Sequence, residues 1–130
     1  MENLLRLLAV LAALVSLSGP ANAHHAFAAV FDGEEAIEIT GKVSKLEWMN
    51  PHTWFYVDVE SADGTVATWA LEMGSPNGLL RRGWSRKTLQ VGQEVKINGY
   101  RAKDGSDKAS VKTVVFADGR ALSGASSKGP

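Results

Sequence analysis

The chain has 130 residues, in which 14 Lys and Arg balance 14 Asp and Glu, 45% of residues are hydrophobic and cysteine is absent. A net charge of zero offers no field that would attract nucleic acid or an anionic membrane surface, so neither partner is expected. The absence of cysteine excludes disulfides and a lipid anchor attached to a cysteine.

The amino-terminal residues have the organisation of a secretory signal peptide. One basic side chain, Arg6, precedes an apolar run over residues 7–17, and the small residues Ala21 and Ala23 follow at the positions that a signal peptidase reads. The run of about 11 residues is shorter than the roughly 20 needed to cross a bilayer. We therefore expect cleavage after Ala23 and a periplasmic or secreted protein, with an uncleaved anchor as the alternative.

Cleavage there would leave a single domain of ordinary size. We expect residues 1–23 to be the signal peptide and residues 24–35 to be a mature amino-terminal segment. The β domain would then span residues 36–122, and residues 123–130, rich in Ser and Gly, would form a flexible tail. No transmembrane segment is expected after cleavage.

A first strand is predicted from Ile37, where apolar side chains alternate on one face as far as Val43. The apolar positions then change parity to Leu46 and Trp48. Because a change of parity within one strand requires an extra residue or a bend, we expect a bulge near Ser44.

Two further strands are predicted over residues 53–60 and 65–73, joined by a turn at an Asp-Gly pair. In both, apolar side chains alternate with polar or aromatic ones. The outer face of this hairpin is therefore expected to present Trp54, Tyr56 and Glu72.

A short helix should follow the third strand. Ser75 offers a side-chain oxygen for the amino-terminal cap, Pro76 suits the first helical position, and Gly83 can adopt the left-handed conformation that ends a helix. We expect about two turns. Val95 and Ile97 then mark a fourth strand.

A fifth strand is marked by Val111, Thr113 and Val115. The Asp118-Gly119 pair should then form the turn of a last hairpin. Three strands with a bent first strand, a short helix and two more strands are the order of an OB-fold. The sequence therefore predicts a mainly β, OB-fold-like barrel of five to six strands, with one short helix between strands 3 and 4. A small β-sandwich or another barrel of five to six strands is the alternative.

The three histidines suggest a metal site. After cleavage, His24 would carry a free amine that can chelate a metal together with its ring, and His25 follows directly. Such nitrogen ligands suit Cu(II) best among the common divalent ions. His52 could close the site if the amino-terminal segment folds back, and Met49 or Met73 could add a soft ligand. The alternative is a solvated tail that binds copper weakly.

Two other segments could bind a ligand. Trp48 and Trp54 flank a turn and could stack on a sugar or another flat molecule, or could simply cover the end of the barrel. The amides after Ser75 could hold an anion, and Glu72 could pair with a nearby arginine, although a basic helix end that interacts with its own dipole is the simpler explanation. The candidate ligand-binding residues are Trp48, Asn50, Trp54, Glu72, Asn77, Arg81, Arg82 and Trp84.

The sequence contains no motif typical of hydrolysis or phosphate transfer, so an enzyme is not the favoured interpretation. Three stretches of the chain are distinctive: His-His-Ala-Phe, Glu-Trp-Met-Asn-Pro-His-Thr-Trp-Phe and Leu-Glu-Met-Gly-Ser-Pro-Asn-Gly-Leu-Leu-Arg-Arg-Gly-Trp. With these motifs the chain resembles a family of small secreted bacterial proteins catalogued as a domain of unknown function. The resemblance implies a shared structure and a secreted location, but no activity.

Taken together, these patterns predict a small periplasmic binding module that binds copper through the mature amino terminus. The alternative is a module of the cell envelope that binds a non-metal ligand or another protein through a surface containing Trp48, Trp54 and Arg81.

Overall fold

The computed structural model describes Met1 and residues 21–125, with six strands and two helices among them. In chain order these elements are α2 (Ala21–Val30), β1 (Phe31–Glu47), β2 (Trp54–Glu60), β3 (Val66–Glu72), α3 (Pro76–Leu80), β4 (Glu94–Ala102), β5 (Lys108–Phe116) and β6 (Ala121–Ser123). The prediction of a mainly β chain with a short helix between the third and fourth strands is confirmed. Among the described residues, neither helix is long and apolar enough to cross a membrane.

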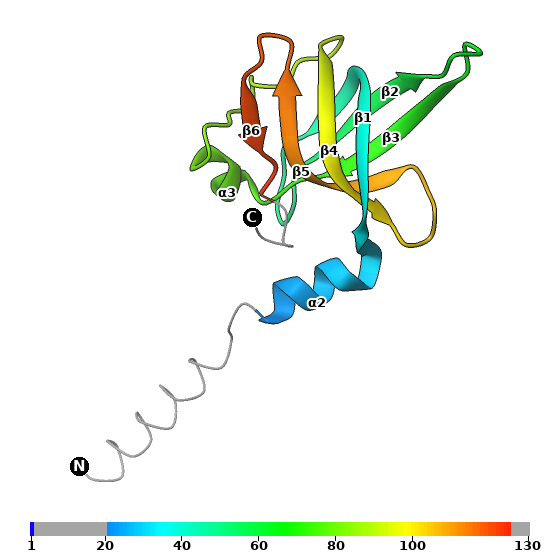
Figure 1. Cartoon of the computed structure of the whole chain (residues 1–130). Coiled ribbons are helices and arrows are strands. Elements are labelled where there is room, and N and C mark those ends of the chain that lie inside the picture. Colours follow the sequence, from blue (N-terminus) through cyan, green and yellow to red (C-terminus); the bar gives the residue numbers. More distant parts are fainter. Residues whose placement is uncertain (2–20, 126–130) are drawn as a thin grey trace.

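The strands form a closed ring of hydrogen bonds. Their order in the sheet is β3-β2-β1-β4-β5-β6, and a parallel pairing between β3 and β5 joins the two sides. The other pairings are antiparallel. Figure 1 shows that α2 lies below one end of the ring and that α3 lies beside β6. We call the end that carries α2 the α2 end.

The long strand β1 belongs to both sides of the ring because it bends. Its first part pairs with β4, its last part pairs with β2, and the register with β2 shifts between Val43 and Lys45. This confirms the bulge predicted near Ser44. At the bend, a side chain at Gly41 would lie 2.6 Å from the carbonyl oxygen of Asp58, so only glycine allows β1 to pass this close to β2. Residues 48–53, which connect β1 to β2, therefore return to the α2 end.

The core fills the inside of the ring. Phe55 and Leu71 are fully buried, as the alternation in β2 and β3 predicts, and Leu79 of α3 joins them. Burial of each such side chain stabilises the fold by about 1.5–3 kcal/mol. The other buried members of this cluster are Val43, Val57, Met73, Trp84, Leu89, Val95, Ile97, Ala109, Val111, Val114 and Phe116.

The short helix α3 has the predicted amino-terminal cap, whereas its carboxyl-terminal cap is Arg81 and not Gly83. The Ser75 side chain accepts a hydrogen bond from the Gly78 amide at 3.2 Å, Pro76 occupies the first helical position, and Gly83 has a φ of 89°. The helix is shorter than predicted, because α-helical structure ends at Leu80 and a turn follows.

Two strands differ from the prediction. β1 begins at Phe31, six residues before the predicted start, because an irregular and largely polar stretch between Phe31 and Ala36 hides its alternation. In β5, Val111, Thr113 and Val115 do not share a face. Gly99 pairs with Val111 and Asn98 pairs with Thr113, so Lys112 is an extra residue and the buried parity changes to Val114 and Phe116.

Helix α2 is attached to the ring near its carboxyl end. Phe27 and Phe31 are buried in a small second cluster with Ala102, and the ring of Tyr100 meets that of Phe27 at a centroid distance of 5.8 Å. The Lys103 ammonium donates to the carbonyl oxygen of Ala28, where a cation also interacts favourably with the helix dipole. The segment predicted at residues 24–35 thus consists of helix and the start of β1.

Of the segment predicted as a tail, Ser123 ends β6 and Gly124 is buried against Val111. The Gly124 amide donates to Lys112, and its carbonyl oxygen accepts from Gly74. Residues 126–130 lie outside the described residues, as do residues 2–20 of the predicted signal peptide.

Candidate functional site

Three strands align polar side chains around one tryptophan at the α2 end. Glu47 of β1 and Glu72 of β3 are the direct partners of Trp54 in β2. Directly opposed residues of an antiparallel pair project from the same face, so the two carboxylates flank the indole on the outside of the ring. Trp54 is half-buried there, which leaves part of its surface accessible.

His52 completes this row from the connection between β1 and β2. Its Nδ1 lies 2.8 Å from Oε1 of Glu72, and 43% of the histidine side chain is exposed, against 18% for the glutamate. The edge of the imidazole that carries Nδ1 therefore contacts the protein, while much of the ring is exposed to solvent. The prediction that Glu72 pairs with an arginine is wrong, because its partner is His52.

The backbone holds the two side chains in fixed positions. The Met73 amide donates to the carbonyl oxygen of Thr53 at 2.8 Å, and the Thr53 amide donates to Gly74 at 3.0 Å. His52 and Glu72 each lie one residue from this pair of bonds. The Thr53 side chain is fully buried, and its hydroxyl has no hydrogen-bond partner among the described residues.

Burial raises the pKa of Glu72 above its ordinary value, while the nearby positive charges of His52 and Lys108 oppose the shift. Lys108 begins β5 and is the strand partner of Ala70, two residues before Glu72. A carboxylate with its charge partly removed from water is a stronger hydrogen-bond acceptor than an exposed one. The environment therefore strengthens its interaction with the imidazole.

On the other side of Trp54, Glu47 belongs to a separate polar group. Its Oε1 pairs with the Lys45 ammonium, and its Oε2 accepts a hydrogen bond from the Tyr56 hydroxyl at 3.1 Å. The hydrogen bond from Lys45, followed by that from Tyr56, lowers the pKa of Glu47. The Lys45 ammonium also lies 5.2 Å from the centre of the Tyr56 ring.

The strand pairings connect this site to α2. Glu72 pairs with Ser110 of β5, and Ser110 pairs with Tyr100 of β4, the residue against which Phe27 packs. Two strand spacings amount to about 10 Å between Glu72 and Tyr100. Helix α2 and His52 therefore lie at the same end of the ring, with the backbone of His24 and His25 in the first half of α2.

The side chains of His24 and His25, two of the three predicted metal ligands, lie outside the described residues. Within the described part of the chain, no three His, Cys, Asp or Glu side chains are grouped so that they could hold a metal ion. Of the two methionines considered as soft ligands, Met73 is buried in the core, whereas Met49 is 48% exposed on the same connection as His52.

The other residues of the loop differ in their surroundings. Trp48 is half-buried and packs against the core, which agrees with the interpretation that it covers the end of the ring. Asn50 is exposed, and the Asn50-Pro51 peptide bond is cis. Trp54 alone of this group lies on the outer face beside the His52–Glu72 pair.

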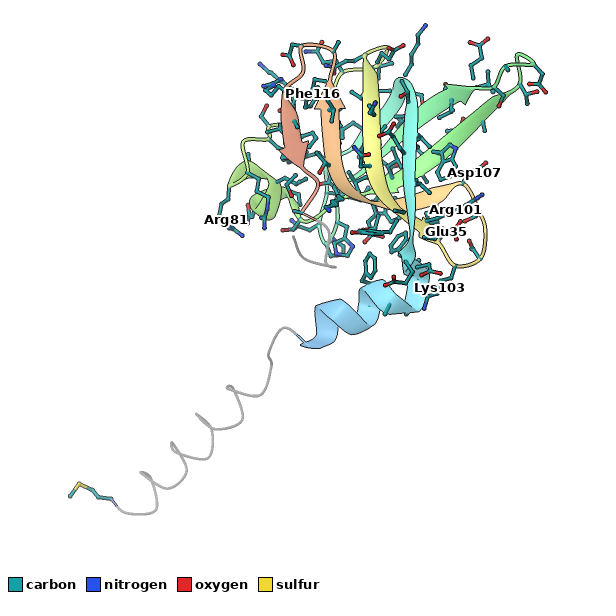
Figure 2. The ribbon with its side chains drawn as sticks, viewed as in Figure 1. Glu35, Arg81, Arg101, Lys103, Asp107 and Phe116 are labelled. Carbon is teal, nitrogen blue, oxygen red and sulfur yellow. The ribbon has the colours of Figure 1, made fainter. Side chains whose placement is uncertain are left out.

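The predicted residues around α3 do not join this site. Arg82 donates to the carbonyl oxygen of Gly78 at 3.0 Å, as expected for a basic residue that caps its own helix, and Asn77 and Arg81 are exposed. In Figure 2, Arg81 lies on the side of the molecule away from Arg101 and Asp107.

Trp84 belongs to the core and not to an accessible surface. It is 3% exposed, its indole nitrogen donates to the carbonyl oxygen of Ser123 at 2.7 Å, and its ring packs against that of Phe116. A side chain so enclosed cannot meet a ligand from solvent. Its neighbours in the sequence did not indicate this burial, because Trp84 stands among basic residues.

Glu47, Lys45 and Lys108 were not predicted from the sequence as members of this site. Lys45 and Glu47 face outward only because the bulge shifts the register of β1, and Lys108 approaches Glu72 only through the parallel pairing of β3 with β5. The alternation of Trp54 and Tyr56 was the one local signal for this face.

A separate hollow of about 490 Å³ lies outside this site. It is lined by residues of β1 to β4 that include Lys42, Asp58 and Glu94, and no residue predicted to bind a ligand or metal is among them. The hollow is therefore not part of the site around the His52–Glu72 pair.

Comparison with known families identifies one match. Residues 12–111 match a family described as "Family of unknown function (DUF6152)". No curated protein matches the chain. The matched range includes His24, His25, His52 and Glu72, and it contains the motifs on which the resemblance to a domain of unknown function was based.

Proposed function

Since the chain belongs to this family of unknown function, we propose that it is a small exported binding module that binds Cu(II) at the α2 end of its strand ring. The ligands in this proposal are the free amine and ring of His24, the ring of His25, and the ring of His52. Nitrogen ligands of this kind favour Cu(II) over the other common divalent ions.

The observation that carries the proposal is the attachment of α2 to the end of the ring where His52 lies. Phe27 is 6% exposed and packs against Tyr100, which is two strands from Glu72. His24 precedes Phe27 by three residues in the same helix, so the proposed ligands lie within one turn of this contact along the chain. A solvated tail, the alternative reading of the histidines, would not need such an anchor.

Export rests on the amino-terminal sequence pattern. The peptide bond between Ala23 and His24 lies inside α2, so its cleavage would shorten the helix to residues 24–30. The same cleavage would create the free amine of His24. The proposed location is the periplasm, where copper ions and exported binding proteins can meet. For the fold, the strand order and the closing β3–β5 pairing support an OB-fold-like barrel.

The proposal predicts that His52 contributes to copper affinity. Protein that begins at His24 should bind one Cu(II) in competition with a chromophoric chelator, and His52→Ala should weaken that binding. Asn50→Ala is the matched control, because Asn50 is exposed on the same connection. Equal affinity in all three proteins would show that His52 is not a copper ligand.

A second candidate function has a specific observation in its favour. Trp54 and Tyr56 are half-buried neighbours on the outer face of β2, where flat ligands could stack. Of the predicted surface of Trp48, Trp54 and Arg81, Trp54 belongs to this face, whereas Trp48 packs against the core and Arg81 lies at the carboxyl end of α3. Tryptophan fluorescence titrated with oligosaccharides should then change in the protein and not in Trp54→Leu.

A further inference from the structure

The contact between His52 and Glu72 specifies which ring nitrogen carries the proton. An ionised carboxylate can only accept hydrogen bonds, so the nitrogen that faces it must be protonated. That nitrogen is Nδ1, at 2.8 Å from Oε1. In a neutral imidazole only one nitrogen bears a proton, which leaves Nε2 with the lone pair.

We propose that Glu72 is a positioning residue that fixes His52 in the tautomer with the proton on Nδ1 and thereby makes Nε2 the atom that binds a metal ion. The assignment of the tautomer stands by itself. Its use for a metal rests on the proposed function.

The geometry suits a positioning role. Glu72 is the last residue of β3, and its backbone neighbours exchange hydrogen bonds with Thr53, the residue after His52. The carboxylate is only 18% exposed, so water competes weakly for the imidazole proton. In contrast, 43% of the His52 side chain remains exposed, which leaves the ring accessible to a ligand.

Metal-binding histidines commonly donate their second nitrogen to a carboxylate, which orients the ring and makes the other nitrogen more basic. Loss of such a carboxylate typically lowers metal affinity by about 10- to 100-fold. Glu72 stands in this relation to His52, although it would not touch the metal itself.

The tautomer can be measured in metal-free protein by nitrogen-15 NMR of the histidine rings, at about pH 8, where an ordinary histidine is neutral. We expect His52 to show a protonated Nδ1 and an unprotonated Nε2. In Glu72→Leu the ring should revert to the form with the proton on Nε2, which predominates in free histidine.

Glu47→Leu is the matched control. Glu47 flanks Trp54 on the opposite side from Glu72 and pairs with Lys45 and Tyr56, so its loss should leave the His52 spectrum unchanged. A protonated Nε2 in the unaltered protein would overturn the proposal, and that spectrum is decisive even if Glu72→Leu does not fold. A tautomer that stays the same in Glu72→Leu would also overturn the proposal.

A copper titration of the same proteins separates this inference from the proposed function. Glu72→Leu should bind Cu(II) about 10- to 100-fold more weakly than the Glu47→Leu control. If the NMR result is as expected but the unaltered protein binds no copper, the tautomer assignment stands and the proposed function fails. If copper binds equally to both variants, the metal-related role of Glu72 is refuted while copper binding stands.

Discussion

His52 and Thr53 are neighbours in the chain, but their polar side chains meet opposite surroundings. The imidazole of His52 is half exposed and bound to a carboxylate, whereas the Thr53 hydroxyl is buried without a partner among the described residues. A buried hydroxyl that makes no hydrogen bond costs about 1–3 kcal/mol. Thr53 therefore weakens the fold at the point where the backbone holds His52 and Glu72 together.

Thr53→Val should test this cost, because valine has nearly the same shape and lacks the hydroxyl. We expect the free energy of unfolding to stay the same or to rise by about 1 kcal/mol in a denaturant titration. Thr68→Val is the control, since the Thr68 hydroxyl donates to Asp58 at 2.7 Å and its loss should not stabilise the protein. A clear loss of stability in Thr53→Val would mean that the hydroxyl is satisfied after all.

Glu47 provides a pH-dependent contribution. Its pKa is lowered in the folded protein, first by the hydrogen bond from Lys45 and then by that from Tyr56. A lowered carboxyl pKa gives stability that is present above the unfolded value, about 4.3, and is lost as the pH falls through the folded value. Chemical unfolding at pH 7 and at about pH 3 tests this. The free energy of unfolding should fall less between these two pH values in Glu47→Gln than in the unaltered protein, and an equal fall in both would contradict the prediction.

At the scale of elements, α2 is held by few contacts. Among the described residues, it is attached through the cluster around Phe27, the bond from the Lys103 side chain to Ala28 and the bond from the Lys103 amide to the carbonyl oxygen of Val30. Figure 2 shows Lys103 at the end of the helix. The main core lies inside the ring and does not include α2. The helix should therefore be able to detach without unfolding the strands.

Phe27→Ala should release α2 selectively. We expect faster amide hydrogen exchange over residues 26–30, with unchanged protection in β4 and β5, because the main core keeps all its members. Val30→Ala is the control on the same helix, since Val30 is 43% exposed. Global loss of protection in Phe27→Ala would show that α2 and the ring unfold together.

The elements differ in how far local sequence determines them. The bulge in β1 and the cap of α3 were predictable, because a change of apolar parity and a Ser-Pro pair are local signals. The extra residue in β5 was not, since Val111, Thr113 and Val115 suggest an uninterrupted alternation and Lys112 resembles any exposed lysine. The early start of β1 was hidden by its polar stretch.

At the scale of the whole molecule, the candidate site depends on contacts between distant segments. His52 and Trp54 were recognised as unusual within one motif, but the partner of Glu72 was predicted wrongly because the sequence places it nearer to Arg81 than to His52. Only the β2–β3 register brings Glu72 beside the histidine. The sequence therefore predicted the residues better than their arrangement.

The bend of β1 determines which segments lie at the α2 end. β1 starts and ends at that end because it bends in the middle, so the segment before it and the connection after it lie at the same end of the ring. This arrangement would let a mature terminus at His24 act together with His52. We therefore expect copper binding to depend on both the mature terminus and His52.

The most direct test is electron paramagnetic resonance of one equivalent of Cu(II) bound to protein that begins at His24. We expect a single axial signal with nitrogen couplings, altered both by one extra residue before His24 and by His52→Ala. Weak and heterogeneous signals that are alike in all three proteins would contradict it, and would leave the outer face around Trp54 as the surface to pursue.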